Sequence, residues 1–240
     1  HYNKMNCGRP LGILRMSKPK IRTGIIGAGF AANFHIEAAR RVHGADVDVI
    51  GVHARTDASS QKFAATHGVA AFPDLDSLLD KIDVLHVCIP PALHEEVAVK
   101  ALERDVFAVV EKPLTGYFGD GAADFDGRTA SMTEARTGAL DSIGRMLAAE
   151  ASSKGRILYA ENWVYAPTIQ KEREILEKTK GQILWMHGEE AHSGSHAPSY
   201  GHWNLAGGGS MIGKGCHPLT AALYLKGVEG RARFGKPIRP

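Results

Sequence analysis

The sequence predicts an α/β protein whose first half is a doubly wound, parallel sheet. From residue 21 onward, short apolar runs alternate with helical stretches of about 10–15 residues, the pattern of βαβ units. Residues 83–89 form a near-continuous apolar run, as expected for a strand covered on both faces. A glycine-rich turn follows the first apolar run directly. Because crossovers between parallel strands are right-handed, this alternation winds into one sheet with helices on both faces.

The elements of the first half follow in order. Apolar runs predict strands at 21–26, 47–53, 69–72, 83–89 and 106–111. Between them, helical patterns are expected at 30–42, 57–67, 74–81 and 91–104. Residues 116–127 are rich in glycine and aspartate, so they are expected to form a loop.

The second half has a different character. Helices are predicted at 133–154, 169–178 and 210–225, and strands at 156–161 and 182–187. We expect Trp185 and Met186 of the last strand to lie in the core. Residues 188–209, rich in glycine and histidine, are expected to form a loop, and the residues after 226 a connecting segment.

Composition excludes several classes of protein. The 240 residues are 44% hydrophobic and 23% charged, which is typical of a folded globular chain and excludes a disordered one. The excess of basic over acidic residues is only 29 − 26 = 3, so we expect no nucleic-acid partner. Three cysteines are too few for a disulfide scaffold. No apolar run reaches the roughly 18 residues of a membrane span, and we expect a cytoplasmic protein without a membrane or metal partner.

The turn at 27–32 has the pattern G-x-G-x-x-A between a strand and a helix, which predicts a Rossmann dinucleotide-binding loop. Gly27 would make the tight turn, Gly29 would let the backbone approach a pyrophosphate, and Ala32 would allow close helix–strand packing. Phe30 and Ala31 open the helix whose N-terminus would face the phosphates. The expected cofactor is NAD or NADP, and the alternative is a glycine turn without a ligand.

The choice between the two cofactors stays open. An acidic residue at the end of the second strand favours NAD, whereas an arginine accommodates the 2′-phosphate of NADP. Arg55 lies just beyond that strand end, where no acid stands, and this favours NADP. Asp57 is expected to cap the following helix.

The fifth predicted strand ends in Glu111-Lys112-Pro113. Ligands of open α/β sheets bind at the carboxyl ends of strands, so Lys112 would point into the cofactor crevice. Its ammonium could hydrogen-bond a substrate hydroxyl or stabilise developing alkoxide charge. The alternative is a surface lysine before a turn proline.

Five segments together resemble one family: GIIGAGFAANFH near the start, CIPPALHEEVAVKAL at 88–102, VVEKPL at 109–114, YAENWVYAP at 159–167 and GGGSMIGKGCHPLTAALYL at 207–225. Over roughly residues 20–227 the chain resembles the glucose–fructose oxidoreductase/inositol dehydrogenase/MocA (Gfo/Idh/MocA) family. The resemblance implies an N-terminal Rossmann domain and a C-terminal α/β domain on a large, mainly antiparallel sheet. It also implies NAD(P)-dependent oxidation or reduction of a sugar or polyol, and homo-oligomers formed through the C-terminal sheet.

The resemblance also implies residue roles. Lys112, with Glu111 beside it, would touch both the substrate and the nicotinamide ribose, and Pro90 and His94 would line the cofactor. Asn162 and Tyr165 would face the substrate, and His217 would be the acid/base, a role that suits a group with a pKa near 6.5.

One departure from the family pattern stands next to that histidine. Many members carry an aspartate four residues earlier, which orients the imidazole, but this chain has Gly213 there, followed by Lys214. Either another residue orients His217 or the chemistry differs. Lys214 would bind an anionic substrate group or lie in solvent.

The loop from 187 to 203 carries four histidines, and three interpretations stay open. His192, His196 and Trp203 would bind a sugar through polar edges and an apolar face. Alternatively, Glu189, His192 and His196 would bind a metal, although Gly194 argues against the helix that such spacing requires. The third interpretation is a mobile surface loop.

We therefore divide the chain into a tail at 1–19, a dinucleotide-binding domain at 20–130 and a partial substrate and oligomerisation domain at 131–240. The expected function is a sugar or polyol oxidoreductase. The alternatives are a glycoside hydrolase that uses tightly bound NAD for transient oxidation of the sugar, and a non-catalytic nucleotide-binding sensor. Because the family's members are longer chains, the second sheet is expected to be incomplete.

Overall fold

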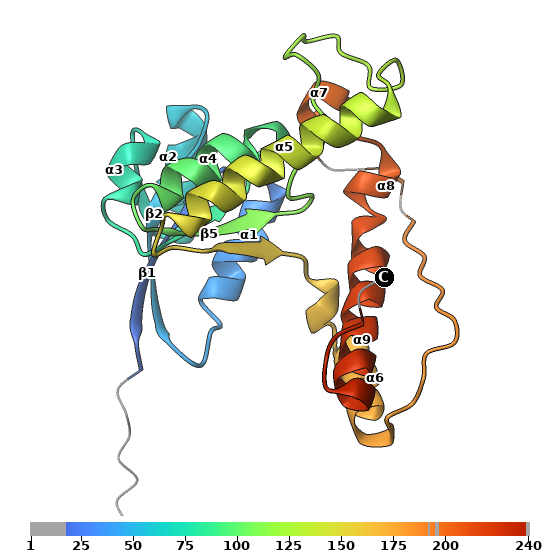
Figure 1. Ribbon diagram of the computed structural model, residues 1–240. Helices are drawn as coiled ribbons and strands as arrows, with labels where there is room; N and C mark the ends of the chain where they lie inside the picture. Colours follow the sequence, from blue (N-terminus) through green and yellow to red (C-terminus); the bar gives the residue numbers. More distant parts are fainter. Residues whose placement is uncertain (1–17, 192, 195–196, 239–240) are drawn as a thin grey trace, which may run out of the picture.

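The structure is a computed structural model that describes residues 18–191, 193–194 and 197–238, so His192 and His196 lie outside the described residues. Its centre is a sheet of six strands in the order β3-β2-β1-β4-β5-β6, with every neighbouring pair parallel (Figure 1). This is the strand order of a Rossmann fold, and it confirms the predicted doubly wound parallel sheet. The strands are β1 (Lys20–Ile26), β2 (Asp46–His53), β3 (Ala70–Ala71), β4 (Val84–Val87), β5 (Phe107–Glu111) and β6 (Ile157–Ala160).

Helices cover both faces of this sheet. On one face, α1 (Phe30–Ala39) and α2 (Asp57–His67) bury Ile36 and Phe63 against Ile25 and Val52. On the other face, α3 (Leu75–Leu79), α4 (His94–Leu102) and α5 (Met132–Ala151) pack on the strands, and a short 3-10 helix, η1 (Pro91–Leu93), leads into α4. Thirteen buried residues form this second cluster, among them Leu85 and Val110. Alternate side chains of β4 and β5 therefore belong to this second cluster.

The sheet extends past residue 130, where the sequence analysis placed the end of the dinucleotide-binding domain. Residues 108–111 of β5 pair in parallel with residues 157–160 of β6. The long helix α5 makes the crossover between them and packs on α4. The domain boundary at residue 130 stays a prediction. The sixth strand ends directly before Glu161, a residue of the candidate site described below.

The predicted strand at 182–187 is wrong. These residues have no strand structure, and Leu184 and Trp185 are 86% and 78% exposed. No strand occurs after residue 160 in the described residues, so the predicted antiparallel sheet is not present there. The apolar pattern alone cannot make a strand, because a strand also needs a neighbour to satisfy its backbone groups.

The C-terminal part is helical instead. After a 3-10 turn, η2 (Trp163–Tyr165), the helix α6 (Pro167–Thr179) lies along α9 (Cys216–Phe234), and Leu176, Leu225 and Val228 form their shared core. Figure 1 shows this pair standing beside the β6 edge of the sheet. The helix expected at 210–225 is divided into α8 (Ser210–Gly213) and α9. The latter continues beyond 226, where a connecting segment was expected, and ends at Gly235 in the left-handed conformation.

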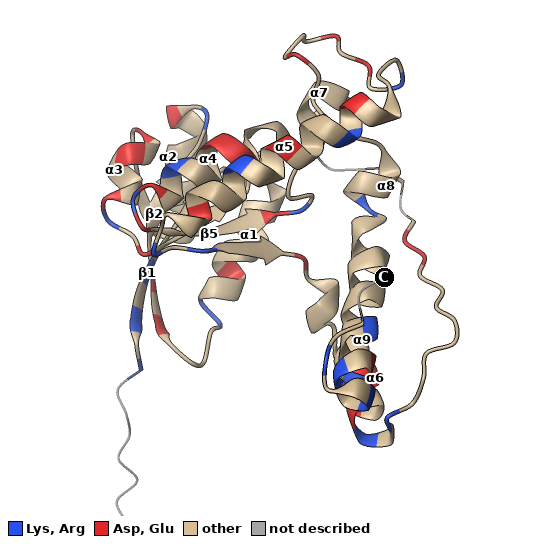
Figure 2. Ribbon diagram, in the orientation of Figure 1, with Lys and Arg blue, Asp and Glu red and all other residues tan. Residues whose placement is uncertain are grey.

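Surface charge of both signs is distributed over the helices (Figure 2). On α6, for example, Glu174 pairs with Lys171 and Lys178, and Arg173 lies 3.9 Å from Glu177. Such exposed pairs at helical spacing each stabilise a helix by about 0.3–0.5 kcal/mol. In the part of the chain that the structure describes, no helix is long and apolar enough to cross a membrane.

Candidate active site at the carboxyl edge of the sheet

The glycine loop joins β1 to α1 at the carboxyl edge of the sheet. Gly27 has φ +103°, and its N–H donates a 2.8 Å hydrogen bond to the carbonyl of His53. A Cβ atom here would lie 2.2 Å from the carbonyl oxygen of Cys88, on the strand at the other side. Both the backbone conformation and the available space therefore require glycine at this position.

Gly29 has a different environment. It precedes α1 in an extended conformation without a side-chain cap, and a Cβ added to it would have no heavy atom within 4 Å. The first turn of α1 thus presents backbone N–H groups to open space, which suits a pyrophosphate. Phe30 is 58% exposed and Ala31 half-buried beside this space, whereas Ala32 is fully buried against the sheet. These residues fit a dinucleotide.

Arg55 is exposed two residues after β2, and its contact with the cofactor stays a prediction. The cap of α2 is Thr56 and not Asp57, because the Thr56 hydroxyl accepts the Ser59 N–H at 3.2 Å. The prediction for Asp57 is therefore wrong by one residue, and Asp57 lies in the first turn of α2.

The loop after β4 contains Pro90 and is held from beneath by His94. The His94 ring is fully buried, and its two nitrogens lie 3.0 Å from the carbonyl oxygens of Ile89 and Pro113. Burial lowers the pKa of His94, and these carbonyls oppose that effect. His94 thus connects the loop after β4 to the loop after β5, and its lining of the cofactor stays a prediction.

Lys112 extends from the end of β5 to α8. Its ammonium donates a 3.0 Å hydrogen bond to the carbonyl of Gly213 and lies 5.7 Å from the centre of the Tyr200 ring. The Tyr200 hydroxyl donates to the Lys112 carbonyl at 3.3 Å, and burial together with the charge of Glu111 raises the pKa of Tyr200 to about 12. The ammonium is therefore held where the family pattern has the aspartate, with a carbonyl in place of a carboxylate.

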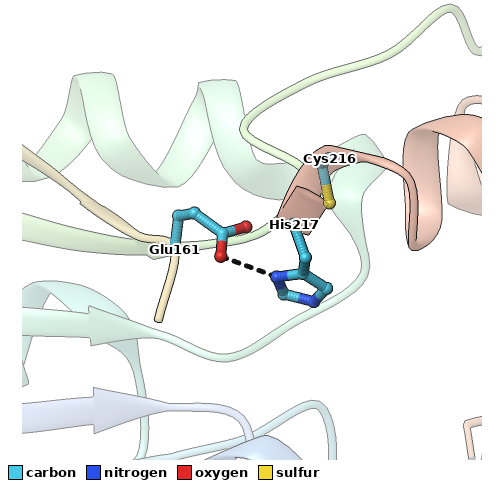
Figure 3. A group of neighbouring side chains, drawn as sticks. All are labelled: Glu161, Cys216 and His217. Carbon is cyan, nitrogen blue, oxygen red and sulfur yellow. Dashed lines mark hydrogen bonds and ion pairs between the residues drawn. The ribbon is translucent and has the colours of Figure 1, made fainter. Parts of the chain in front are cut away.

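A carboxylate does reach His217, but from another element. Glu161 directly follows β6, and its Oε1 accepts a 2.7 Å hydrogen bond from His217 Nδ1 (Figure 3). The same oxygen accepts the Trp163 N–H at 2.9 Å, and the Trp163 ring stacks on the imidazole at 5.8 Å with an angle of 13°. Glu161 and His217 are only 2% and 6% exposed. This pair is well shielded from water, which strengthens its electrostatic interaction.

The other ring nitrogen of His217 faces a second carboxylate. Glu190 Oε2 lies 3.9 Å from His217 Nε2, which is beyond direct hydrogen-bond distance. Because the Glu161 carboxylate can only accept, Nδ1 carries the hydrogen, and in the neutral ring Nε2 is then the free base.

A buried polar chain runs beneath Lys112. Glu111 Oε2 accepts the Lys112 N–H at 3.0 Å, and Glu111 Oε1 lies 3.0 Å from His35 Nε2. The Nδ1 atoms of His35 and His86 are 2.9 Å apart. Burial favours a raised pKa for Glu111, but the hydrogen bond and charge of His35 outweigh it and lower the pKa. The chain ties α1, β4 and β5 together directly under the cofactor edge.

The other predicted substrate residues lie around this centre or apart from it. Asn162 and Tyr165 flank Trp163 and are exposed, and Lys214 is half-buried beside α9. Trp203 begins the short helix α7 (Trp203–Ala206), which follows the 3-10 helix η3 (Pro198–Gly201). It lines a hollow with Asp124, Asp126 and their neighbours. Their contacts with substrate, and those expected of His192 and His196, stay predictions.

Sequence reasoning did not identify four residues of this centre: Glu161, Trp163, Glu190 and Tyr200. An acidic residue at the end of a predicted strand is a signal for Glu161, had that strand been assigned to the first sheet. For Glu190 and Tyr200 the sequence carries no comparable signal, because both lie in irregular segments.

Comparison with known proteins connects this geometry to a family. Residues 21–123 match Gfo/Idh/MocA, described as an oxidoreductase family with an NAD-binding Rossmann fold. A dTDP-3,4-didehydro-2,6-dideoxy-alpha-D-glucose 3-reductase of Streptomyces antibioticus is 30% identical over 219 residues, 89% of this chain and 59% of the relative. An inositol 2-dehydrogenase of Arthrobacter sp. (strain FB24) is 40% identical over 100 residues, 40% of this chain and 29% of the relative.

Solved structures agree on the fold. GenD2 from gentamicin A biosynthesis, crystallised with NAD, has a TM-score of 0.67 at 19% identity, covering 90% of this chain and 57% of that one. The WlbA dehydrogenase of Bordetella pertussis, with NADH and UDP-GlcNAcA, has a TM-score of 0.64 at 21% identity, covering 88% and 56%. This chain thus spans less than two thirds of the length of these relatives. Over residues 21–123 the chain matches the NAD-binding Rossmann fold of the Gfo/Idh/MocA oxidoreductase family, and it is similar to that family over this part.

Proposed function

We propose that this chain is an NAD(P)-dependent oxidoreductase that moves a hydride between the nicotinamide and a carbinol carbon of a sugar or polyol. The observation that supports it most is the buried Glu161–His217 pair, which lies with Lys112 at the carboxyl edge of a Rossmann sheet. The relatives named above include a reductase of a nucleotide-linked sugar and a dehydrogenase of inositol. A carbohydrate or polyol is the substrate class that fits both.

The residues divide the work as follows. The glycine loop and the first turn of α1 would hold the pyrophosphate, and a bound nicotinamide supplies or accepts the hydride. His217 Nε2 takes the proton of the reacting hydroxyl in oxidation and returns it in reduction. Glu161 holds the imidazole in the Nδ1–H tautomer and stabilises its protonated form. The Lys112 ammonium stabilises negative charge on the reacting oxygen.

The two alternative functions stay predictions, and Glu161 weakens the argument for both. They were considered because Gly213 replaces an orienting aspartate, and Glu161 now supplies a carboxylate to the same imidazole. A redox-neutral hydrolase would cleave aryl glycosides with no net change in NADH absorbance. A sensor would bind nucleotide and turn over nothing.

The test begins with the cofactor. Titration with NADH and with NADPH, followed by nicotinamide fluorescence, should show saturable binding of at least one, and absence of both would overturn the proposal. The chain is then assayed for NAD(P)H turnover on nucleotide-linked hexoses, free hexoses and inositol. His217→Ala and Lys112→Ala should each lower kcat by about 10²–10⁴-fold, the usual contribution of such groups. Lys154→Ala, at an exposed lysine far along the surface, is the matched control.

A further inference from the structure

The Glu161–His217 pair is part of a larger group of metal-ligating side chains. Cys216 precedes His217 at the start of α9, and one donor atom from each of Glu161, Cys216 and His217 lies within 4.8 Å of the other two. Figure 3 shows the thiol, the imidazole and the carboxylate gathered in one place, from β6 on one side and α9 on the other. Among the residues that the structure describes, this is the only group of three such donors.

Two carboxylate oxygens beside this group are buried and unsatisfied. Glu161 uses Oε1 for both of its hydrogen bonds, and its Oε2 has no hydrogen-bond partner within the described residues. Glu190 Oε2 is in the same situation. Buried oxygens that carry negative charge without a partner are costly, so they point to a cation that the site would accept.

The second carboxylate also fits the surroundings of a metal centre. A metal-bound histidine almost always donates its other ring N–H to a carboxylate or carbonyl. With the metal on the Nδ1 side of His217, the Nε2–H would face Glu190 Oε2, now 3.9 Å away. The imidazole therefore has a candidate metal on one side and a candidate hydrogen-bond acceptor on the other.

We propose that Glu161, Cys216 and His217 bind one divalent transition-metal ion of the zinc type. A carboxylate, a thiolate and an imidazole are zinc ligands, and three protein ligands leave one tetrahedral position for water or a substrate oxygen. The ion takes the place of the proton on His217 Nδ1 and binds the Glu161 carboxylate, whose Oε2 is the oxygen without a hydrogen-bond partner in the described residues.

The charges and protons of this step balance. The Cys216 thiol releases its proton to solvent, and the hydrogen on His217 Nδ1 is replaced by one on Nε2. The two positive charges of the ion then meet the thiolate and the Glu161 carboxylate, so the site becomes neutral. Neutrality matters because the residues involved are largely buried, where an uncompensated charge is expensive.

The proposed site goes beyond the proposed function and does not depend on it. The two share His217, so a bound ion removes the imidazole from acid/base work. Zinc is therefore an inhibitor of the proposed oxidoreductase that acts at the substrate side, while cofactor binding at the glycine loop continues.

Cobalt(II) tests the site directly in the full chain, because a cobalt–thiolate bond gives a near-ultraviolet charge-transfer band. The wild type should bind one cobalt ion with this band, and added zinc should displace it. Cys216→Ser should lose the band, whereas Cys88→Ser and Cys7→Ser should keep it. Glu190→Gln should weaken cobalt binding by about 10–100-fold, as removal of a partner of a metal-bound histidine does.

The outcomes separate the two proposals. No cobalt band in the wild type, or a band that persists in Cys216→Ser, overturns the metal site. Circular dichroism melting checks that Cys216→Ser is folded. We expect it to melt like the wild type, since serine is nearly isosteric with cysteine. NADH titration of the zinc-loaded chain is the second readout: saturable binding together with lost turnover supports competition at His217. If NADH never binds while the cobalt band is present, the proposed function fails and the metal site stands.

Discussion

At the scale of single residues, the motifs predict Lys112 and His217 as site residues but not the side chains that contact them. Lys112 and His217 follow from short patterns, because each stands at a fixed place in a segment. Glu161 does not, since its role depends on which sheet receives β6 and how α9 lies against that strand. A hydrogen bond between residues 56 positions apart has no signature in a local pattern.

The Glu161→Gln variant tests the role of that carboxylate. The amide can accept from His217 Nδ1–H but carries no charge to stabilise the imidazolium. We expect kcat to fall by about 10²-fold, with cofactor affinity unchanged. Glu172→Gln on the exposed side of α6 is the control, and an unchanged kcat in Glu161→Gln would contradict the assignment.

His86 makes stability depend on pH. Burial, and to a smaller extent the charge of His35, lowers the pKa of His86 to about 4 from the usual 6.5. Between these values the unfolded chain binds a proton that the folded chain refuses, so stability is lost as pH falls from about 6.5 to about 4. The loss amounts to about 3 kcal/mol at 1.36 kcal/mol per pKa unit.

Urea unfolding at several pH values measures this loss. His86→Gln should have a smaller fall in the free energy of unfolding between pH 7 and pH 4 than the wild type. His94, whose pKa is also lowered by burial, remains in both proteins. His43→Gln, at an exposed position, should keep the wild-type dependence. An equal fall in His86→Gln and wild type would show that His86 is not held neutral.

At the scale of elements, the strands and helices of the first half were predictable, and so were α5, β6 and α6 of the second half, whereas the strand expected at 182–187 was wrong. Strands β1, β2, β4 and β5 are apolar runs that lie between two helical layers, so their pattern reflects a burial that the structure provides. The run at 182–187 has the same composition, but its backbone has no strand beside it. The Ile183 N–H donates to a distant acceptor, the buried carboxylate of Glu229. An apolar run therefore predicts that a segment can form a strand, and the strand forms only where a neighbouring strand pairs with it.

The two glycines at the start of α1 should respond differently to alanine. Gly27→Ala places a Cβ 2.2 Å from the Cys88 carbonyl at φ +103°, so we expect destabilisation by several kcal/mol or failure to fold. Gly29→Ala meets no atom within 4 Å and should melt within a few degrees of wild type. Its methyl group enters the space expected for the pyrophosphate, and NADH affinity should fall by at least about tenfold. Unchanged affinity in a folded Gly29→Ala would place the cofactor elsewhere.

At the scale of the whole molecule, the sheet with its helices and the α6–α9 pair meet at the site, and they differ in the size of their apolar cores. The sheet and its helices contain the two large apolar clusters, whereas α6 and α9 share a small one of three buried residues. Glu229 adds polar support to the small cluster: its buried carboxylate accepts from Lys226, Arg233 and the Ile183 N–H. The hydrogen bond of Lys226 lowers the pKa of Glu229.

Hydrogen exchange should reveal this inequality. Amides of β1, β4 and β5 should exchange slowest, and those of Leu184 and Trp185 fastest. The amide of Ile183 should exchange at an intermediate rate. Glu229→Gln should accelerate exchange at Ile183 and in α9 while leaving β1 and β4 unchanged, because it removes the charge that holds Lys226 and Arg233. Glu174→Gln, on the exposed face of α6, is the control. Uniform exchange across both parts would show that they unfold as one unit.

Glu161 follows β6, whereas His217 lies on α9, so the carboxylate and the imidazole that it contacts come from separate segments of the chain. In a self-contained Asp–His helix both functions must be transferred together, so recombination that brings in only part of the helix destroys the pair. Here β6 retains Glu161 whatever helix is joined after it. A transplanted α8–α9 segment without an aspartate of its own would still find its histidine oriented. Position 213 then needs no acid for this purpose, and the carbonyl of Gly213 accepts from Lys112.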